Sequence, residues 1–261
     1  MLQFPNFNPY IFKLGSIHPT WYGLMYVIGF GCAYLLGVRR TKSNPAWTKE
    51  DVSDLMTYLM LGVVLGGRIG YVLFYGMGYW ARDWFYPLKI WEGGMSFHGG
   101  LLGVTFLLWL FGRKKGKTFW QVADYVAPMI PPGLFFGRIG NFINGELWGR
   151  PTDLPWGMVF PGTGDGIPRH PSQLYEAGLE GIVLFIAVWF YSAKPRRSGQ
   201  VAGLFLVLYG IFRSLVEMVR QPDGQVNFLI GEITMGQALS LPMIVFGLWL
   251  MLRRGPRASI S

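Results

Sequence analysis

Residues 137–149 read Gly137-Arg138-Ile139-Gly140-Asn141-Phe142-Ile143-Asn144-Gly145-Glu146-Leu147-Trp148-Gly149, and this stretch decides how the rest of the chain is interpreted. An arginine, two asparagines, a glutamate and four glycines stand beside a strongly apolar run. In hydrocarbon each unpaired polar group is costly, so such a cluster predicts a cavity that supplies partners or water. The alternative is a kinked helix that packs through its small residues. Because charged and amide side chains accompany the glycines, we interpret the stretch as a functional site.

The composition of the whole chain is that of an integral membrane protein. Of 261 residues, 51% are hydrophobic and only 14% charged, and the mean hydropathy is +0.32. A soluble domain has about 25% charged residues. Three histidines and one cysteine exclude a Cys-rich metal site and an intramolecular disulfide, and we expect neither a metal nor a cofactor. The first twenty residues contain no continuous apolar core, so we expect no cleavable signal peptide.

Apolar segments of the length required to cross a hydrocarbon core of ~30 Å recur along the chain. We predict seven spans, at about 20–38, 53–75, 95–111, 120–142, 174–191, 201–219 and 234–252. The fourth is the weakest, because Pro128, Pro131 and Pro132 divide it. The predicted fold is therefore an all-α polytopic membrane protein that forms a single domain over residues 1–261.

The positive charges predict the orientation. In this topology, fourteen lysines and arginines lie on the side of the membrane that contains the loop between the first two spans. Six lie on the opposite side of the membrane. The remaining three, Arg68, Arg138 and Arg213, lie within spans. The positive-inside rule therefore places the N-terminus outside and the C-terminus in the cytoplasm, which requires an odd number of spans. The same distribution explains the net charge of +9 better than nucleic-acid binding does.

Two long connections face outward in this topology. Residues 143–173 contain five prolines and six glycines, and we expect a small external head with little regular structure. Residues 76–94 are rich in tryptophan and tyrosine, which suit the headgroup region of a membrane.

Several polar residues fall at the outward ends of spans. His98 begins the third span, Arg138 and Asn141 end the fourth, and Arg213 and Glu217 share one helix face at a spacing of four residues. Each has an alternative: a core histidine for His98, and a structural pair for Arg213 and Glu217. Arg68 could bind headgroups or brace the bundle.

Three arginines inside spans of one small protein need a common anionic partner, because an unpaired arginine at a helix centre costs ~2.5–3.5 kcal/mol. At the level of the headgroups the obvious partner is a lipid phosphate, which the fork of the guanidinium group binds better than an ammonium group does.

Four motifs carry a resemblance to a known family. They are Met95-Ser96-Phe97-His98-Gly99-Gly100, the stretch 137–149, Arg169-His170-Pro171-Ser172-Gln173-Leu174-Tyr175-Glu176, and Phe212-Arg213 with Glu217 and Arg220-Gln221-Pro222-Asp223. Together with Trp21-Tyr22-Gly23-Leu24-Met25-Tyr26, they closely resemble bacterial prolipoprotein diacylglyceryl transferases. The resemblance runs nearly from end to end.

The resemblance implies a reaction, its partners and a site. A diacylglyceryl group would move from phosphatidylglycerol to the lipobox cysteine of a preprolipoprotein, with release of glycerol phosphate. The enzyme would work in the inner membrane, with its active site open to the periplasmic side. Arg138 and Arg213 would bind the lipid phosphate. The essential or supporting positions implied by the resemblance are Tyr22, His98, Asn141, Glu146, Gly149 and Glu217.

The residue types suit this chemistry. A thiol of pKa ~8.5 is mostly protonated at pH 7, so a nearby base helps, and histidine is the usual candidate. His98 is therefore the candidate base, although the thiol could lose its proton to water or to the leaving group. Two other classes stay open. A transporter or flippase also contains broken helices, and a phosphatidyl or acyl transferase would break a different bond.

Overall fold

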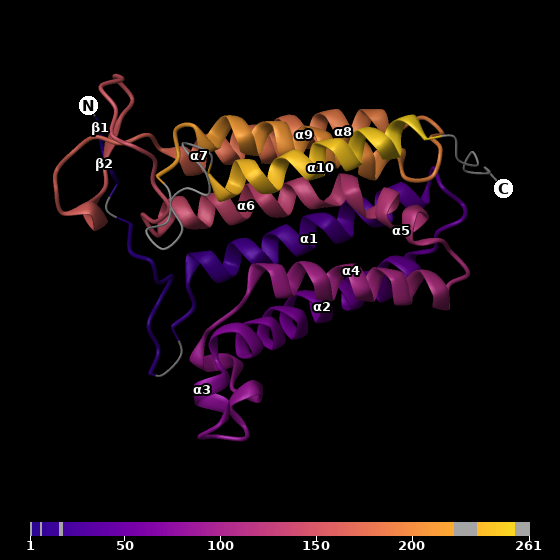
Figure 1. The fold of residues 1–261 in the computed structure, drawn as a ribbon, viewed down its shortest axis with the longest axis horizontal. Helices are drawn as coiled ribbons and strands as arrows, with labels where there is room; N and C mark the ends of the chain where they lie inside the picture. The colour runs from indigo at the N-terminus through magenta and orange to yellow at the C-terminus, as the bar shows by residue number, and fades with distance from the viewer. Residues whose placement is uncertain (1, 6, 16–17, 222–233, 254–261) are drawn as a thin grey trace. The chain divides into compact units, whose positions relative to one another are not determined.

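The computed structural model describes residues 2–5, 7–15, 18–221 and 234–253, and these are mostly helical (Figure 1). Two parts of the sequence discussed above, Pro222-Asp223 and the basic residues Arg254 and Arg257, lie outside the described residues. The α-helices are α1 (Trp21–Thr41), α2 (Lys49–Tyr75), α3 (Met77–Trp80), α4 (Phe97–Lys114), α5 (Phe119–Val126), α6 (Ile130–Ile143), α7 (Ser172–Glu176), α8 (Leu184–Tyr191), α9 (Gln200–Glu217) and α10 (Met235–Leu252). Short 3₁₀ helices are η1 (Tyr86–Leu88), η2 (Ile90–Glu92), η3 (Ala127–Met129) and η4 (Pro161–Thr163), and η5 (Ala177–Val183) is a π-helix.

All seven segments predicted to span the membrane are helical. Within the described residues, five continuous helical stretches are long and apolar enough to cross a membrane by length and composition: Trp21–Thr41, Lys49–Tyr75, Ser172–Tyr191, Gln200–Glu217 and Met235–Leu252. The third predicted span is α4, whose last turn carries Arg113 and Lys114. The fourth is divided into α5, η3 and α6, as its prolines predicted. The count of seven spans and the orientation stay predictions.

The prolines of the divided segment stand where a helix tolerates them. Pro131 and Pro132 lie in the first turn of α6, where the missing N–H groups have no helical partner in any case. Pro128 lies inside η3. The break therefore lets α6 begin afresh at Ile130 and carry Arg138 and Asn141 to its C-terminal half.

The chain forms two compact units. Unit 1 contains Met1–Leu36 and the described residues from Asp124 onward, and unit 2 contains Gly37–Ala123. The single domain over residues 1–261 stays a prediction.

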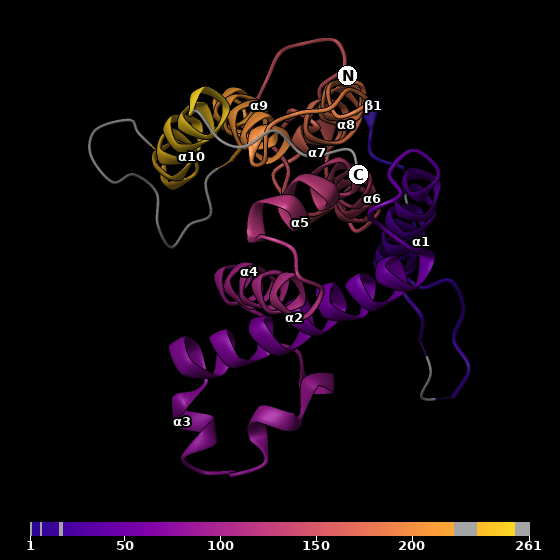
Figure 2. The same cartoon turned by 90° about the vertical axis from the view of Figure 1, so that its right-hand side faces the viewer.

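In unit 2, α2 and α4 pack closely against each other through glycines (Figure 2). A Cβ atom added to Gly66 would lie 2.5 Å from the Gly99 carbonyl oxygen, and one added to Gly103 would lie 2.5 Å from the Gly62 carbonyl oxygen. Helices in a membrane have no hydrophobic driving force between them, so such close backbone packing supplies the association. Each N-terminus is capped by a hydroxyl side chain, from Thr48 for α2 and Ser96 for α4.

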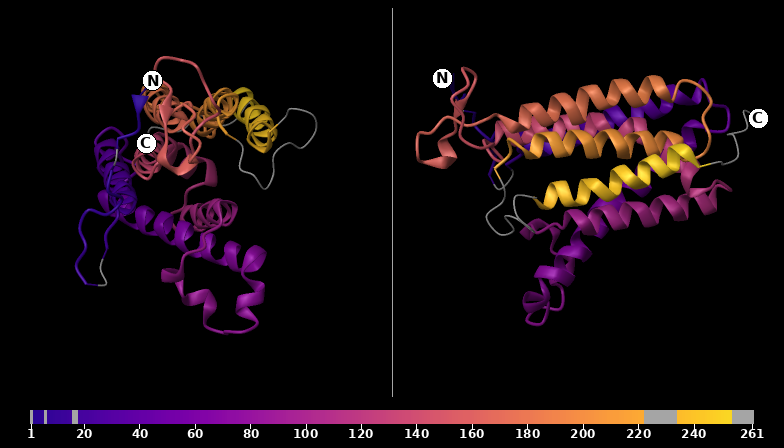
Figure 3. Two further views of the ribbon diagram at one scale, coloured as in Figure 1. Left: turned by 90° about the vertical axis from the view of Figure 1, so that its left-hand side faces the viewer. Right: turned by 45° about the horizontal axis from the view of Figure 1, so that its top comes forward.

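In unit 1, α9 and α10 lie side by side along most of their lengths (Figure 3). The closest approach is at Gly203 and Gly247, where a Cβ atom on Gly247 would lie 2.7 Å from the Gly203 carbonyl oxygen. An apolar core formed by Leu184, Val188 and Val201 joins α8 to α9. Gly181 of η5 packs on Phe135 of α6. These contacts fix the helices on which the polar residues of the site stand.

The predicted head has little regular structure, as expected. Its one strand, β2 (Met158–Val159), pairs in parallel with β1 (Leu2–Gln3), so the N-terminal segment is attached to the head. Next to this pair, the ring of Phe4 contacts those of Phe142 and Phe160. This two-stranded sheet, with two residues in each strand, departs from the all-α prediction. Strands this short show no periodicity in the sequence, and their pairing partners are more than 150 residues apart.

Candidate active site

The polar residues that follow α6 form a connected chain of hydrogen bonds. Arg138 Nη1 donates to Asn141 Oδ1 at 3.4 Å, and Asn141 Nδ2 donates to Glu146 Oε1 at 2.8 Å. Asn144 Nδ2 also donates to Glu146 Oε1, at 3.3 Å. The four polar residues of the stretch 137–149 are therefore brought together, as the sequence predicted.

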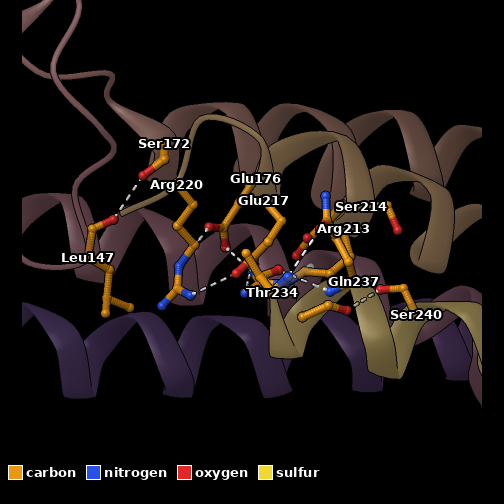
Figure 4. Close-up of polar contacts among 12 residues, drawn as sticks. Leu147, Ser172, Glu176, Arg213, Ser214, Glu217, Arg220, Thr234, Gln237 and Ser240 are labelled. Atoms are coloured by element: carbon orange, nitrogen blue, oxygen red, sulfur yellow. Dashed lines mark hydrogen bonds and ion pairs between the residues drawn. The ribbon is translucent and has the colours of Figure 1, made fainter. Parts of the chain in front are cut away.

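Two buried side chains of α7 hold the turn that carries Glu146. Gln173 Nε2 donates to the Glu146 carbonyl oxygen at 2.5 Å. Ser172 Oγ donates to the Leu147 carbonyl oxygen at 2.9 Å (Figure 4). Leu147 has a φ of 58°, a left-handed conformation that costs a non-glycine residue energy. The two hydrogen bonds offset that strain and fix the position of the Glu146 backbone.

Gly149 lies where three segments of backbone meet. Its N–H donates to the His170 carbonyl oxygen at 2.8 Å, and a Cβ atom would lie 2.5 Å from the Val219 carbonyl oxygen. Next to it, Arg150 donates through its backbone N–H to the same Val219 carbonyl oxygen. Only glycine fits this position, so the residue is required by packing.

Tyr22 reaches this region from α1. A Cβ atom on Gly140 would lie 2.8 Å from Tyr22 Cδ2, and seven residues further along α1, one on Gly29 would lie 3.2 Å from Gly133 Cα. The first half of α1 therefore runs antiparallel to α6. The Tyr22 hydroxyl lies 3.1 Å from the Tyr26 hydroxyl.

An ionic cluster fills the space beside this chain of hydrogen bonds. It combines three arginines, Arg138, Arg213 and Arg220, with three glutamates, Glu176, Glu180 and Glu217. Among the ion pairs of this cluster that do not involve Arg138, the shortest joins Arg213 Nη2 to Glu217 Oε2 at 2.8 Å (Figure 4). Among the described residues of the cluster, the three carboxylates are at most 4% exposed, while the side chains of Arg138 and Arg213 keep 21% and 15% exposure. The accessible side of the cluster is thus positive.

Comparison with known proteins identifies the family to which this site belongs. A model of the prolipoprotein diacylglyceryl transferase family matches residues 9–253. The phosphatidylglycerol–prolipoprotein diacylglyceryl transferase of Solidesulfovibrio magneticus is 57% identical over 264 positions, which cover 100% of both chains. Those of Bordetella avium and Legionella pneumophila (strain Lens) are 56% and 57% identical and cover 99% and 96% of this chain, and 99% and 98% of their own. The chain belongs to the prolipoprotein diacylglyceryl transferase family. It is a multi-pass membrane transferase.

In this transferase, sequence reasoning missed three members of the ionic cluster. Glu176 and Glu180 lie inside a predicted apolar span, and a charged residue in such a place is itself a signal of function. Arg220 was counted among the charges of an outward loop, but its guanidinium group lies 3.7 Å from Glu217 Oε1. The pairing of Arg213 with Glu217 was predicted correctly from their spacing along one helix face.

Arg68, in unit 2, is held by backbone carbonyl groups. Its side chain donates to the carbonyl oxygens of Tyr86 at 2.6 Å, Pro87 at 3.2 Å and Gly94 at 3.3 Å, and also to that of Gly93. Four of the five N–H groups of the guanidinium are therefore occupied. Of the two interpretations given above, this bonding favours bracing of the segment 86–94 over headgroup binding. Nothing in the sequence near Arg68 reveals these partners, which lie 18 to 26 residues later.

His98, also in unit 2, is the second residue of α4, two residues after the capping residue Ser96. Its side chain is exposed and makes an edge contact with the ring of Phe97. An exposed imidazole does not fit the alternative of a core histidine. The structure thus leaves His98 accessible for proton transfer.

Two ionisable groups of the head have altered pKa values. A hydrogen bond from the Ile167 backbone and the ion pair with Arg169 lower the pKa of Asp165 to about 2. Burial lowers the pKa of His170 below its usual value, so its ring is neutral at pH 7. Neither group changes its charge between pH 7 and pH 9.

Proposed function

We propose that this chain transfers the diacylglyceryl group of phosphatidylglycerol to the lipobox cysteine of a preprolipoprotein and releases glycerol phosphate. The observation that supports this most directly is the match to full-length diacylglyceryl transferases, together with the arginines that gather at one end of unit 1. The thiolate sulfur attacks the glycerol carbon of the lipid. The carbon–oxygen bond to the phosphate breaks, and the phosphate monoester departs with the electron pair.

In this proposal Arg138 and Arg213 bind the phosphate and stabilise the charge that grows on it as the bond breaks. Asn141 bonds the glycerol or a phosphate ester oxygen, and Glu146 orients the Asn141 amide. Glu217 holds Arg213, and Tyr22 and Gly149 support the surrounding backbone. His98 accepts the thiol proton. No covalent intermediate with the enzyme is required.

Product analysis tests the proposed reaction against its alternatives. The purified protein is incubated with phosphatidylglycerol, labelled in the headgroup glycerol, and a lipobox peptide. We expect the peptide to gain the mass of a diacylglyceryl group and the label to appear as glycerol phosphate. A peptide that gains a phosphatidyl group or a single acyl chain would show that a different bond breaks. A protein that moves the lipid across vesicles and leaves the peptide unchanged would be a transporter.

We also propose that the site opens towards the outer side of the bacterial inner membrane, with the N-terminus outside and seven spans. In a Cys32→Ser background, Arg82→Cys and Asp165→Cys should react with an impermeant maleimide added to intact cells. Lys115→Cys and Arg197→Cys should react only after the membrane is permeabilised, which also controls for their reactivity. Labelling of position 115 from outside would overturn the orientation.

A further inference from the structure

Glu176 is the residue that connects the arginines of the site. Its Oε2 atom contacts Arg138 Nε. The same Oε2 atom lies 3.4 Å from Arg213 Nη1, and Oε1 lies 3.9 Å from Arg220 Nε (Figure 4). The three arginines belong to α6, to α9 and to the residues just after α9. One carboxylate therefore joins α6 to α9 and the residues that directly follow α9.

The contacts of Glu176 leave the arginines able to bind a ligand. Glu176 contacts Arg138 through Nε and Arg213 through Nη1, which is one nitrogen of each guanidinium group. The other nitrogens of each group are not held by this carboxylate. Glu176 is only 1% exposed, whereas the side chains of Arg138 and Arg213 are partly exposed. An anion that enters from the accessible side meets the two arginines and does not meet the carboxylate.

Each of the other two glutamates lies within ion-pair distance of one of the two proposed phosphate-binding arginines. Glu217 contacts Arg213 and Arg220, and Glu180 contacts Arg138 through a single pair of atoms 3.9 Å apart. Of the three carboxylates, Glu176 has contacts with both proposed phosphate-binding residues. We propose that Glu176 is a positioning residue that holds Arg138 and Arg213 convergent on the phosphate of the lipid. This inference rests on the proposed function.

The position of Glu176 on its helix explains how it can hold Arg138 and Arg213 in place. Ser172 and Gln173, one turn earlier on α7, hold the backbone of Glu146 and Leu147, so the same short helix fixes both halves of the site. Glu176 also lies at the junction of α7 with the π-helix η5. A π-helical turn is rare and is found frequently at functional sites.

The test compares Glu176→Gln with Glu50→Gln, which removes the same charge at an exposed residue in the first turn of α2, outside the ionic cluster. At saturating phosphatidylglycerol we expect Glu176→Gln to lower kcat at least about tenfold, because the arginines are no longer aligned with the charge that develops on the phosphate. The KM for phosphatidylglycerol should not rise, because the site has gained one uncompensated positive charge. We expect Glu50→Gln to retain the wild-type kcat. Rates are compared per amount of folded protein.

Loss of one partner of a buried pair is strongly destabilising, so a second variant keeps the test decisive if Glu176→Gln does not fold. Glu176→Asp retains the charge but withdraws the carboxylate by one methylene, so it cannot reach all three arginines. It should lower kcat while its melting temperature stays near that of the wild type. Wild-type kcat in Glu176→Asp, or a raised KM for phosphatidylglycerol with unchanged kcat in Glu176→Gln, would overturn the inference. A wild-type protein that transfers no diacylglyceryl group would instead refute the proposed function.

Discussion

Arg138→Lys is expected to insert and fold normally and yet to lose diacylglyceryl transfer by roughly 10²–10³-fold. Lysine keeps the charge but loses the planar, two-pronged group that matches a phosphate. In the structure, Arg138 uses separate nitrogen atoms for separate tasks, with Nε against Glu176 and Nη1 against Asn141. A single ammonium group cannot make both contacts and also bind an anion. The measurement is transfer to a lipobox peptide at saturating phosphatidylglycerol, at equal amounts of folded enzyme.

A control variant separates this effect from a general sensitivity to the substitution. Arg39 is exposed in the last turn of α1, and Arg39→Lys should retain the wild-type rate. Near-wild-type transfer by Arg138→Lys would show that the position contributes only charge, and two-pronged recognition of the phosphate would then be wrong.

How much of this site could be predicted from the sequence depends on how far apart the interacting residues lie along the chain. Arg138, Asn141, Asn144 and Glu146 lie within nine residues of one another, and their hydrogen bonds form inside that short stretch. The pair of Arg213 and Glu217 follows from helix geometry alone. Local spacing is sufficient for such contacts, while the roles of these residues in binding the phosphate stay predictions.

Contacts between distant segments were not predictable in the same way. Glu176 meets Arg138 across 38 residues and Arg213 across 37, and nothing in the local sequence selects those partners. The carbonyl groups that bind Arg68 could not be predicted either, because every residue has a backbone carbonyl and the sequence does not show which of them will accept a hydrogen bond. Hydropathy is enough to locate the spans and to show that charged residues within them need partners. Which residues become those partners is determined only by the fold.

The break in the fourth predicted span, unlike these long-range contacts, follows from a property of the local sequence. Proline lacks the N–H group that a helix interior needs, and three prolines within five residues impose a new helix start at Ile130. That start sets which residues of α6 face the ionic cluster. A property of the residue itself therefore fixes the register of the site.

His98→Gln is expected to lower turnover by roughly 10²–10⁴-fold at pH 7 if His98 is the general base. The loss should shrink as the pH rises from 7 to 9. A thiol of pKa ~8.5 ionises without help over that range, so the variant recovers rate while the wild type gains little. Asp165 and His170 do not change charge between these pH values, so they do not contribute to the recovery.

The matched control is His18→Gln, which makes the same substitution at an exposed histidine near the N-terminus. It should retain the wild-type rate and pH profile. The measurement is kcat for transfer to the lipobox peptide at half-unit steps of pH, with both variants beside the wild type. A loss in His98→Gln that stays constant from pH 7 to pH 9 would assign His98 to positioning of a substrate. A thiol that loses its proton to water or to the leaving phosphate would then be the better mechanism, because neither route depends on the imidazole.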